Sequence, residues 1–139
     1  MSRVRLSEPK VISNPRGNIS RILRATENDF AGFGEAYLTS INEGATKGWK
    51  KHARMVMNLV VPHGKVGFYL LEEDSGNKTY VELGEDNYKR LCVMPGVWMA
   101  FRGLAQGSSL VLNIASIEHD PAEAINRGID EFELDDWLG

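Results

Sequence analysis

The sequence predicts an all-β fold, built as an antiparallel barrel or double-sheet jelly roll with few short helical turns. Short apolar runs recur along the whole chain, and turn residues separate them, among them 14 glycines and 5 prolines. Strands at such close spacing are typical of antiparallel barrels and sandwiches. At 139 residues without an internal repeat, the chain is expected to form a single domain over residues 1–139.

The first third of the chain predicts a hairpin followed by a longer strand. Residues 11–13 and 19–24 have extended patterns and flank the turn Asn14-Pro15-Arg16-Gly17-Asn18, whose residue types favour chain reversal. Residues 28–34 predict a loop or one helical turn. Residues 35–41 then predict a strand.

The stretch 47–66 organises the rest of the sequence, because a basic cluster with a histidine runs into an apolar segment. If it is one strand, alternation places Lys50, His52, Arg54 and Asn58 on one face. Polar side chains in a row are costly to bury unless they are paired or line a wet cavity. We therefore expect this face to look into a binding pocket. The opposite face, expected to form core or dimer contacts, carries Lys51, Ala53, Met55, Met57 and Leu59.

The second half of the chain predicts a succession of strands with turns between them. Apolar and β-branched runs bounded by Gly, Pro and Asn support each assignment. The expected strands cover residues 65–72, 79–83, 88–93, 97–103 and 108–116, and residues 121–127 are expected to form a helical turn.

Composition excludes several classes of function. The chain has 16 basic and 19 acidic residues and a net charge of −3, whereas a nucleic-acid-binding domain is usually basic. No apolar stretch approaches the roughly 20 residues that span a bilayer, and no export signal is evident, so we expect no membrane partner and a cytoplasmic location. The single Cys92 forms no intrachain disulfide and is expected to be a buried structural thiol.

Three stretches together resemble the cupin-fold sugar-nucleotide enzymes, namely the dTDP-4-dehydrorhamnose 3,5-epimerase family and its short relatives, the dTDP-sugar 3,4-ketoisomerases. Residues 14–19 resemble an acidic-x-Arg-Gly-x-aromatic segment of the epimerases. The stretch Lys47-Gly48-Trp49-Lys50-Lys51-His52 lies where the family carries Arg-Gly-x-His. Residues 87–98 are similar to a family segment that ends in Pro-Pro-Gly. The resemblance implies a jelly-roll cupin and a nucleotide-sugar substrate.

The chain also departs from the family pattern. Lys50 stands where the ketoisomerases have the first histidine of an Arg-Gly-x-His-x-His motif. Met99 or a neighbour replaces the histidine that follows the Pro-Gly turn. The epimerase tyrosine of the last strand falls near Asn113. The late aspartate that orients the epimerase histidine lies in an extension that this chain lacks.

The resemblance implies catalytic roles for His52, Lys50 and Tyr88. His52 would be the general base that removes the acidic proton beside a 4-keto group, and Lys50 would stabilise the enolate. Tyr88 and Tyr37 are candidate acids on the opposite face of the sugar. The alternative for His52 is a structural, hydrogen-bonded histidine at the start of a strand.

Substrate-binding residues are expected around this base. Arginine guanidinium groups bind diphosphate oxygens in a bidentate way, and indole rings stack on a base or a sugar face. Buried asparagines in apolar strands need a partner, which a ligand would supply. A surface ion pair for Arg16 and core packing for the tryptophans are the alternatives. The expected set is Arg16, Lys47, Trp49, Arg54, Asn58, Arg90, Trp98 and Asn113.

No metal and no cofactor are expected. A metal-binding cupin needs about three histidines and a carboxylate, and the positions of His63 and His119 in turns predict that they do not meet His52. The leading hypothesis is an epimerase acting on a dTDP-4-keto-6-deoxysugar. The alternatives are a 3,4-ketoisomerase and a non-catalytic sugar-nucleotide-binding cupin. A homodimer is the expected assembly.

Overall fold

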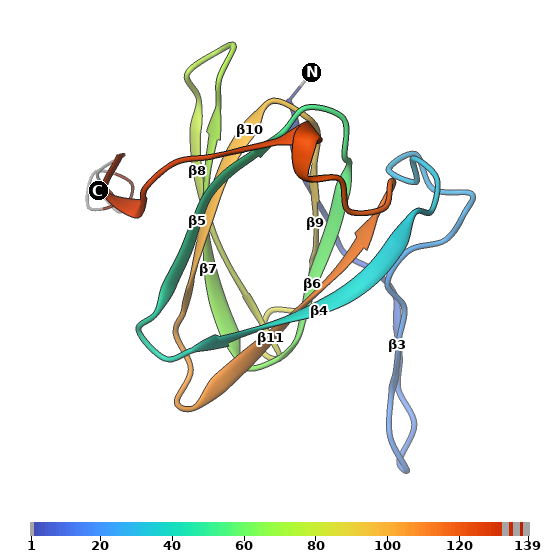
Figure 1. Cartoon of the computed structure of the whole chain (residues 1–139). Helices are drawn as coiled ribbons and strands as arrows, with labels where there is room; N and C mark the ends of the chain where they lie inside the picture. Colours follow the sequence, from blue (N-terminus) through green and yellow to red (C-terminus); the bar gives the residue numbers. More distant parts are fainter. Residues whose placement is uncertain (1, 132–133, 135–136, 138–139) are drawn as a thin grey trace.

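Strands make up nearly all regular structure in the computed structural model, which describes residues 2–131, 134 and 137 (Figure 1). Two short 3₁₀ turns interrupt the strands between residues 121 and 131. Within the described part of the chain no helix is long and apolar enough to cross a membrane. The elements are β1 (Val4–Ser7), β2 (Val11–Ile12), β3 (Ile19–Ser20), β4 (Glu35–Asn42), β5 (Thr46–His52), β6 (Met57–His63), β7 (Lys65–Glu72), β8 (Lys78–Gly84), β9 (Arg90–Val93), β10 (Val97–Gly103), β11 (Ser108–Ala115), η1 (Pro121–Glu123), β12 (Ala124–Asn126) and η2 (Ile129–Glu131).

The strands form two five-stranded sheets and a small hairpin. One sheet has the order β1-β9-β6-β11-β4, and the other has the order β12-β5-β10-β7-β8. Every ladder between these strands is antiparallel. The two sheets face each other as the walls of a barrel, and the tip of the β2–β3 hairpin extends beyond it (Figure 1). This architecture confirms the predicted all-β jelly-roll cupin.

The main core lies between the two sheets. Each strand turns alternate side chains inward, so apolar residues two positions apart meet in the same layer. Burying a large aliphatic or aromatic side chain contributes about 1.5–3 kcal/mol, and this cluster contains many. Its members include Leu59, Val61, Phe68, Leu70, Leu91 and Val93.

A second apolar cluster lies on the outer face of the sheet that contains β5. It is built from Trp49, Tyr69, Trp98 and Ala100, all buried. The C-terminal part of the chain covers this face, and Trp137 packs against the cluster. Trp49 and Trp98 therefore lie behind the barrel wall and not inside the barrel.

The prediction of one continuous strand through residues 47–66 is wrong. The chain bends after His52, and the next strand, β6, begins at Met57 in the other sheet. The alternation of side chains between the two faces therefore does not continue from β5 into β6. Met55 and Met57, expected on the back face, line the barrel interior, whereas Asn58 points outward and donates from Nδ2 to the carbonyl oxygen of Asp29 (3.1 Å).

Candidate active site

A cavity of about 290 Å³ opens inside the barrel, between the two sheets. Its walls come from β4, β5 and β10, from the start of β6 and from the C-terminal segment. Polar and cationic groups lie on one side, and methionine and aromatic side chains lie on the other. The lining residues are Tyr37, Thr39, Lys47, Gly48, Lys50, His52, Met55, Met57, Met99, Phe101, His119 and Asn126.

A bulge in β5 brings Lys47 and Lys50 to the same side of the sheet. Lys47 pairs with Phe101 and Lys50 with Met99, so β5 has one more residue than β10 between these pairs. Gly48 lies in this bulge with a φ of +136°, and a Cβ there would lie 2.7 Å from the Cα of Ala100. Only glycine suits this position. The bulge lets two cations and His52 face one cavity.

The Glu123 carboxylate holds His52 in place. Glu123 Oε1 is hydrogen-bonded to His52 Nδ1, and Oε2 accepts the backbone N–H groups of Ala53 (3.2 Å), Arg54 (3.0 Å) and Met55 (3.2 Å). Burial raises the pKa of Glu123, but the hydrogen bonds from His52 and from the Arg54 and Met55 amides outweigh it, and the pKa lies below its ordinary value. The carboxylate is therefore ionised at neutral pH.

This pair determines which nitrogen of His52 can act on a ligand. An ionised carboxylate only accepts hydrogen bonds, so the neutral ring carries its proton on Nδ1. Nε2 is then unprotonated and is the nitrogen left for a molecule in the cavity. The sequence suggested that the orienting carboxylate of the epimerases is missing, but Glu123 supplies one from a different position in the chain.

Tyr37 reaches the cavity from the opposite sheet. Its hydroxyl oxygen accepts a hydrogen bond from Asn113 Nδ2 (2.9 Å), and Asn113 Oδ1 accepts the backbone N–H of Asn58 (3.2 Å). Asn113 is itself 2% exposed and does not line the cavity. Its structural partner is Tyr37.

His119 and the lysines complete the polar side of the cavity. His119 lines the same cavity as His52, so the prediction that the two do not meet is wrong; the backbone N–H of His119 donates to Glu35 Oε1 (2.8 Å) and anchors its loop. Lys47 Nζ donates to the carbonyl oxygen of Ser40 (2.8 Å). In the part of the chain that the structure describes, no group of three or more His, Cys, Asp or Glu side chains could hold a metal ion.

Three more of the expected site residues, Arg16, Arg54 and Tyr88, also lie away from this cavity. Arg16 is exposed in the turn between β2 and β3. The Arg54 guanidinium pairs with Asp120 Oδ2 at 3.0 Å, at the surface. The Tyr88 hydroxyl donates to the carbonyl oxygen of Arg21 at 2.8 Å. The structure does not bring Arg16, Arg54 or Tyr88 to His52.

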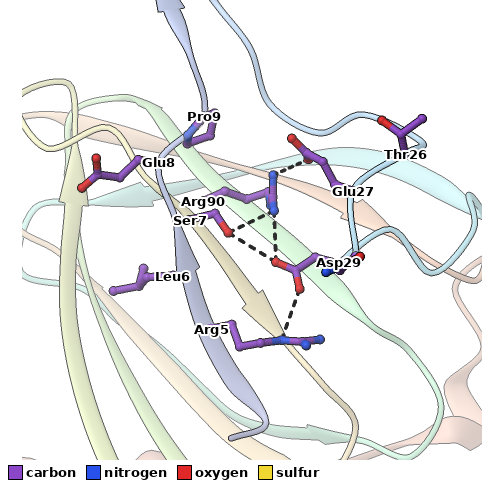
Figure 2. A pocket seen from close by; sticks show the side chains of 10 residues that line it. Arg5, Leu6, Ser7, Glu8, Pro9, Thr26, Glu27, Asp29 and Arg90 are labelled. Atoms are coloured by element: carbon purple, nitrogen blue, oxygen red, sulfur yellow. Dashed lines mark hydrogen bonds and ion pairs between the residues drawn. The ribbon is translucent and has the colours of Figure 1, made fainter. Parts of the chain in front are cut away.

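Arg90 lies in a separate buried network on the outer face of β9 (Figure 2). Its guanidinium donates to Glu27 Oε2 (2.8 Å), Asp29 Oδ2 (3.0 Å) and Ser7 Oγ (3.2 Å), and it also donates to the carbonyl oxygen of Ile22 (2.8 Å). Asp29 pairs with Arg5 Nε as well (3.2 Å). These bonds join the 22–29 segment to β1 and β9. Protein groups thus already bind the two terminal nitrogens of the guanidinium that was expected to meet a substrate.

Comparisons with known proteins agree with this fold. A dTDP sugar isomerase from Desulfovibrio desulfuricans G20 superposes with a TM-score of 0.87 at 30% identity, over 92% of this chain and 85% of that chain. QdtA, a sugar 3,4-ketoisomerase from Thermoanaerobacterium thermosaccharolyticum solved with TDP, shares the fold with a TM-score of 0.78 at 23% identity, over 92% and 90%.

A relative from sequence comparison is SpsL of Bacillus subtilis (strain 168), a spore coat polysaccharide biosynthesis protein. It is 27% identical over 122 residues, which cover 84% of this chain and 81% of SpsL. The resemblance to sugar-nucleotide epimerases and ketoisomerases is therefore confirmed. Because the family model described as "FdtA: WxcM-like, C-terminal" matches residues 2–134, the chain belongs to the FdtA, WxcM-like C-terminal family.

Proposed function

We propose that this protein is an acid–base isomerase that moves the carbonyl group of a dTDP-4-keto-6-deoxysugar from C4 to C3. The observation that carries the proposal is the hydrogen bond between His52 and Glu123 at the wall of the cavity. It places the proton of a neutral imidazole on Nδ1 and leaves Nε2 to take a proton. Family membership and the isomerase at 30% identity support the same class of reaction.

The reaction needs two proton transfers, one between carbons and one between oxygens. His52 Nε2 removes the proton from C3, the C–H electron pair forms a C3–C4 double bond, and the C4 carbonyl oxygen becomes an enolate that is protonated. The O3 proton then leaves and its electron pair forms the C3 carbonyl. The double bond takes a proton at C4 from His52, after the ring N–H has exchanged with solvent. The product has the same atoms and the same overall oxidation state as the substrate, so the reaction needs no oxidant or reductant.

Other groups in the cavity can carry out the proton transfers at the two sugar oxygens, O4 and O3. The Lys50 ammonium stabilises the negative enolate oxygen. Tyr37 and His119 both line the cavity, and a hydroxyl or an imidazole can donate to one oxygen and accept from the other. Lys47 and Lys50 also give the cavity the positive charge that a nucleotide diphosphate requires.

An epimerase is the second candidate, for one specific reason. His52 lies on β5 and Tyr37 on β4, which belong to opposite sheets. Groups that reach a sugar ring from opposite sides can remove a proton from one face and return it to the other. That arrangement inverts a carbon without moving the carbonyl.

Incubation with dTDP-4-keto-6-deoxyglucose in D₂O, followed by proton and carbon NMR, separates these functions. A ketoisomerase moves the carbonyl signal to C3 and places deuterium at C4. An epimerase leaves the carbonyl at C4 and places deuterium at C3, with or without C5. If the carbonyl stays at C4 and no deuterium enters the sugar, but TDP binds in a calorimetric titration, the protein is a non-catalytic sugar-nucleotide-binding protein.

We further propose a homodimer that uses the outer face of β4 and β11. Leu38 on β4 is 59% exposed, and Leu110, Leu112 and Ile114 on the adjacent strand are half-buried. Such a contiguous apolar face is unusual on a monomer. Analytical ultracentrifugation should give about twice 15.5 kDa, and a Leu38→Lys variant should shift the mass toward the monomer. A wild-type mass of one chain in dilute solution contradicts this assembly.

A further inference from the structure

One C-terminal segment both builds a wall of the cavity and crosses to the outer face of the barrel. Glu123 and Asn126 belong to it, and β12 pairs with β5 so that Ala124 is opposite His52 and Asn126 opposite Lys50. The backbone pairing continues beyond the strand. Arg127 N–H donates to the Trp49 carbonyl oxygen at 2.9 Å, and Trp49 N–H donates to the Arg127 carbonyl oxygen at 3.0 Å.

The end of this segment docks on the outer aromatic cluster. The Arg127 guanidinium lies 4.7 Å from the centre of the Trp98 ring. The Trp137 ring lies 5.6 Å from Trp49 and 6.1 Å from Tyr69. Trp49 Nε1 donates to the Ile129 carbonyl oxygen at 3.3 Å. Figure 1 shows the segment passing from the η1 turn across the strands of this sheet.

β12, the strand between Glu123 and the docked end of the segment, makes few contacts beyond its short pairing with β5. β12 contains three residues at the edge of its sheet, and Ile125 is 50% exposed. A strand of this length is not stable by itself. Its position therefore depends on what is fixed on either side, the Glu123 hydrogen bonds before it and the aromatic docking after it.

We propose that Arg127 and Trp137 are positioning residues for the active site. Their docking on Trp49, Tyr69 and Trp98 fixes β12 along β5, and β12 holds the Glu123 carboxylate against His52 Nδ1. Loss of the docking loosens Glu123, and the proton of His52 is no longer confined to Nδ1. The effect of the docking on turnover rests on the proposed function, whereas its effect on the tautomer of His52 does not.

The test compares Trp137→Ala, Trp137→Phe and Asp130→Asn, which changes an exposed side chain of the same segment. The ¹⁵N shifts of the His52 ring report which nitrogen carries the proton, and hydrogen exchange reports the amides of Arg127 and Ala53. We expect Trp137→Ala to give a mixed tautomer and faster exchange at both amides. Turnover should fall about 10- to 100-fold at nearly unchanged KM, because displaced catalytic groups lose alignment. Trp137→Phe should restore most of each property, and Asp130→Asn should match the wild type.

A melting curve first establishes that each variant is folded. If Trp137→Ala does not fold, Arg127→Gln, which removes the cation over Trp98, carries the same test. A folded variant with wild-type His52 ¹⁵N shifts and wild-type exchange at Ala53 overturns the proposal. If the wild type converts no 4-keto sugar nucleotide, the proposed function fails, and the NMR and exchange measurements still decide whether the docking positions Glu123.

Discussion

Tyr37 and Asn113 face each other across the β4–β11 ladder, and the Asn113 amide donates to the Tyr37 hydroxyl oxygen at 2.9 Å. The orientation of that amide is fixed, because Asn113 Oδ1 accepts the Asn58 backbone N–H, which can only donate. The Tyr37 oxygen is therefore an acceptor toward Asn113. Its own proton remains available to a ligand in the cavity.

Replacement of Tyr37 by Phe should lower turnover by about 100-fold, because general acid catalysis contributes about 10²- to 10⁴-fold. The phenyl ring retains the packing against the core, but Asn113 Nδ2 loses its hydrogen bond to the hydroxyl, so the variant should stay folded with an unfolding free energy lowered by about 1–3 kcal/mol. Tyr88→Phe is the matched control, since the Tyr88 hydroxyl binds the Arg21 carbonyl oxygen outside the cavity. Steady-state kinetics of both variants provide the measurement. If only Tyr88→Phe loses turnover, the general acid is Tyr88, as the sequence suggested, and not Tyr37.

Replacement of His52 by Asn should abolish exchange of solvent deuterium into a 4-keto sugar nucleotide. The amide keeps a hydrogen-bonding group of similar size but has no nitrogen that takes up a proton near pH 7. TDP affinity, measured by calorimetry, should stay within a few-fold because Lys47 and Lys50 remain. Lys50→Met should slow turnover but leave some exchange, since it removes enolate stabilisation and not the base.

His63→Asn serves as the control for the His52 variant. The His63 side chain is 62% exposed and lies near Glu85, away from the cavity. Its replacement should leave deuterium exchange at the wild-type rate. Wild-type exchange in a folded His52→Asn protein would show that the base is a different group, with His119 the next candidate.

The strands of the second half were predictable because local signals bound each of them. Residues 97–103 form the predicted strand, since the Pro95-Gly96 turn marks its start. The break after His52 has no such signal, because residues 53–56 contain neither Gly nor Pro. The backbone N–H groups of residues 53–55 donate to the Glu123 carboxylate instead of to a neighbouring strand, and that of Val56 donates to Ser116 Oγ. A tertiary contact about 70 residues away along the sequence thus sets the local structure.

The same contact explains which site residues escaped prediction. The basic cluster placed Lys47, Lys50 and His52 together, and the structure keeps all three at the cavity. Glu123 lies in a short turn whose sequence carries no catalytic pattern. The β12–β5 pairing and the backbone N–H groups after β5 bring it to His52. The β5 bulge likewise has no clear sequence signal beyond Gly48. It leaves Trp49 on the outer face, where it packs with Trp98.

Arg90 should matter for stability and not for binding. Its side chain is 3% exposed and contacts two carboxylates, so Arg90→Met removes the cation that Glu27 and Asp29 share and leaves only the more exposed Arg24 and Arg5 beside them. Breaking a buried ion pair in this way costs about 3–5 kcal/mol. Arg54→Met, at an exposed ion pair with Asp120, should change the unfolding free energy by less than about 1 kcal/mol. Urea unfolding and TDP titration of both variants test this, and a stable Arg90→Met protein with weakened TDP binding would make Arg90 a substrate ligand.

Glu123 should link stability and turnover to pH. Its pKa is lowered in the folded protein from an ordinary value of 4.5. A carboxyl group with a depressed pKa stabilises the fold above its unfolded-state pKa, and that contribution is lost as the pH falls through the folded-state pKa. The difference in unfolding free energy between wild type and Glu123→Gln should therefore be largest above about pH 5 and shrink below 4.5. Glu118→Gln, at an exposed carboxylate of the same segment, should show no such difference.

The kinetic effect of Glu123→Gln should be large even where the variant is well folded. A glutamine amide can present its oxygen or its nitrogen to His52, so it does not enforce the Nδ1–H tautomer, and loss of an orienting carboxylate in a comparable histidine pair costs up to about 10⁴-fold. We expect kcat to fall by at least about 100-fold near pH 7, with TDP affinity nearly unchanged. Denaturant unfolding from pH 3 to 8 and single-turnover kinetics check both parts. A variant with wild-type kcat, or a stability difference that grows as the pH falls, would contradict the role of Glu123 as the ionised partner of His52.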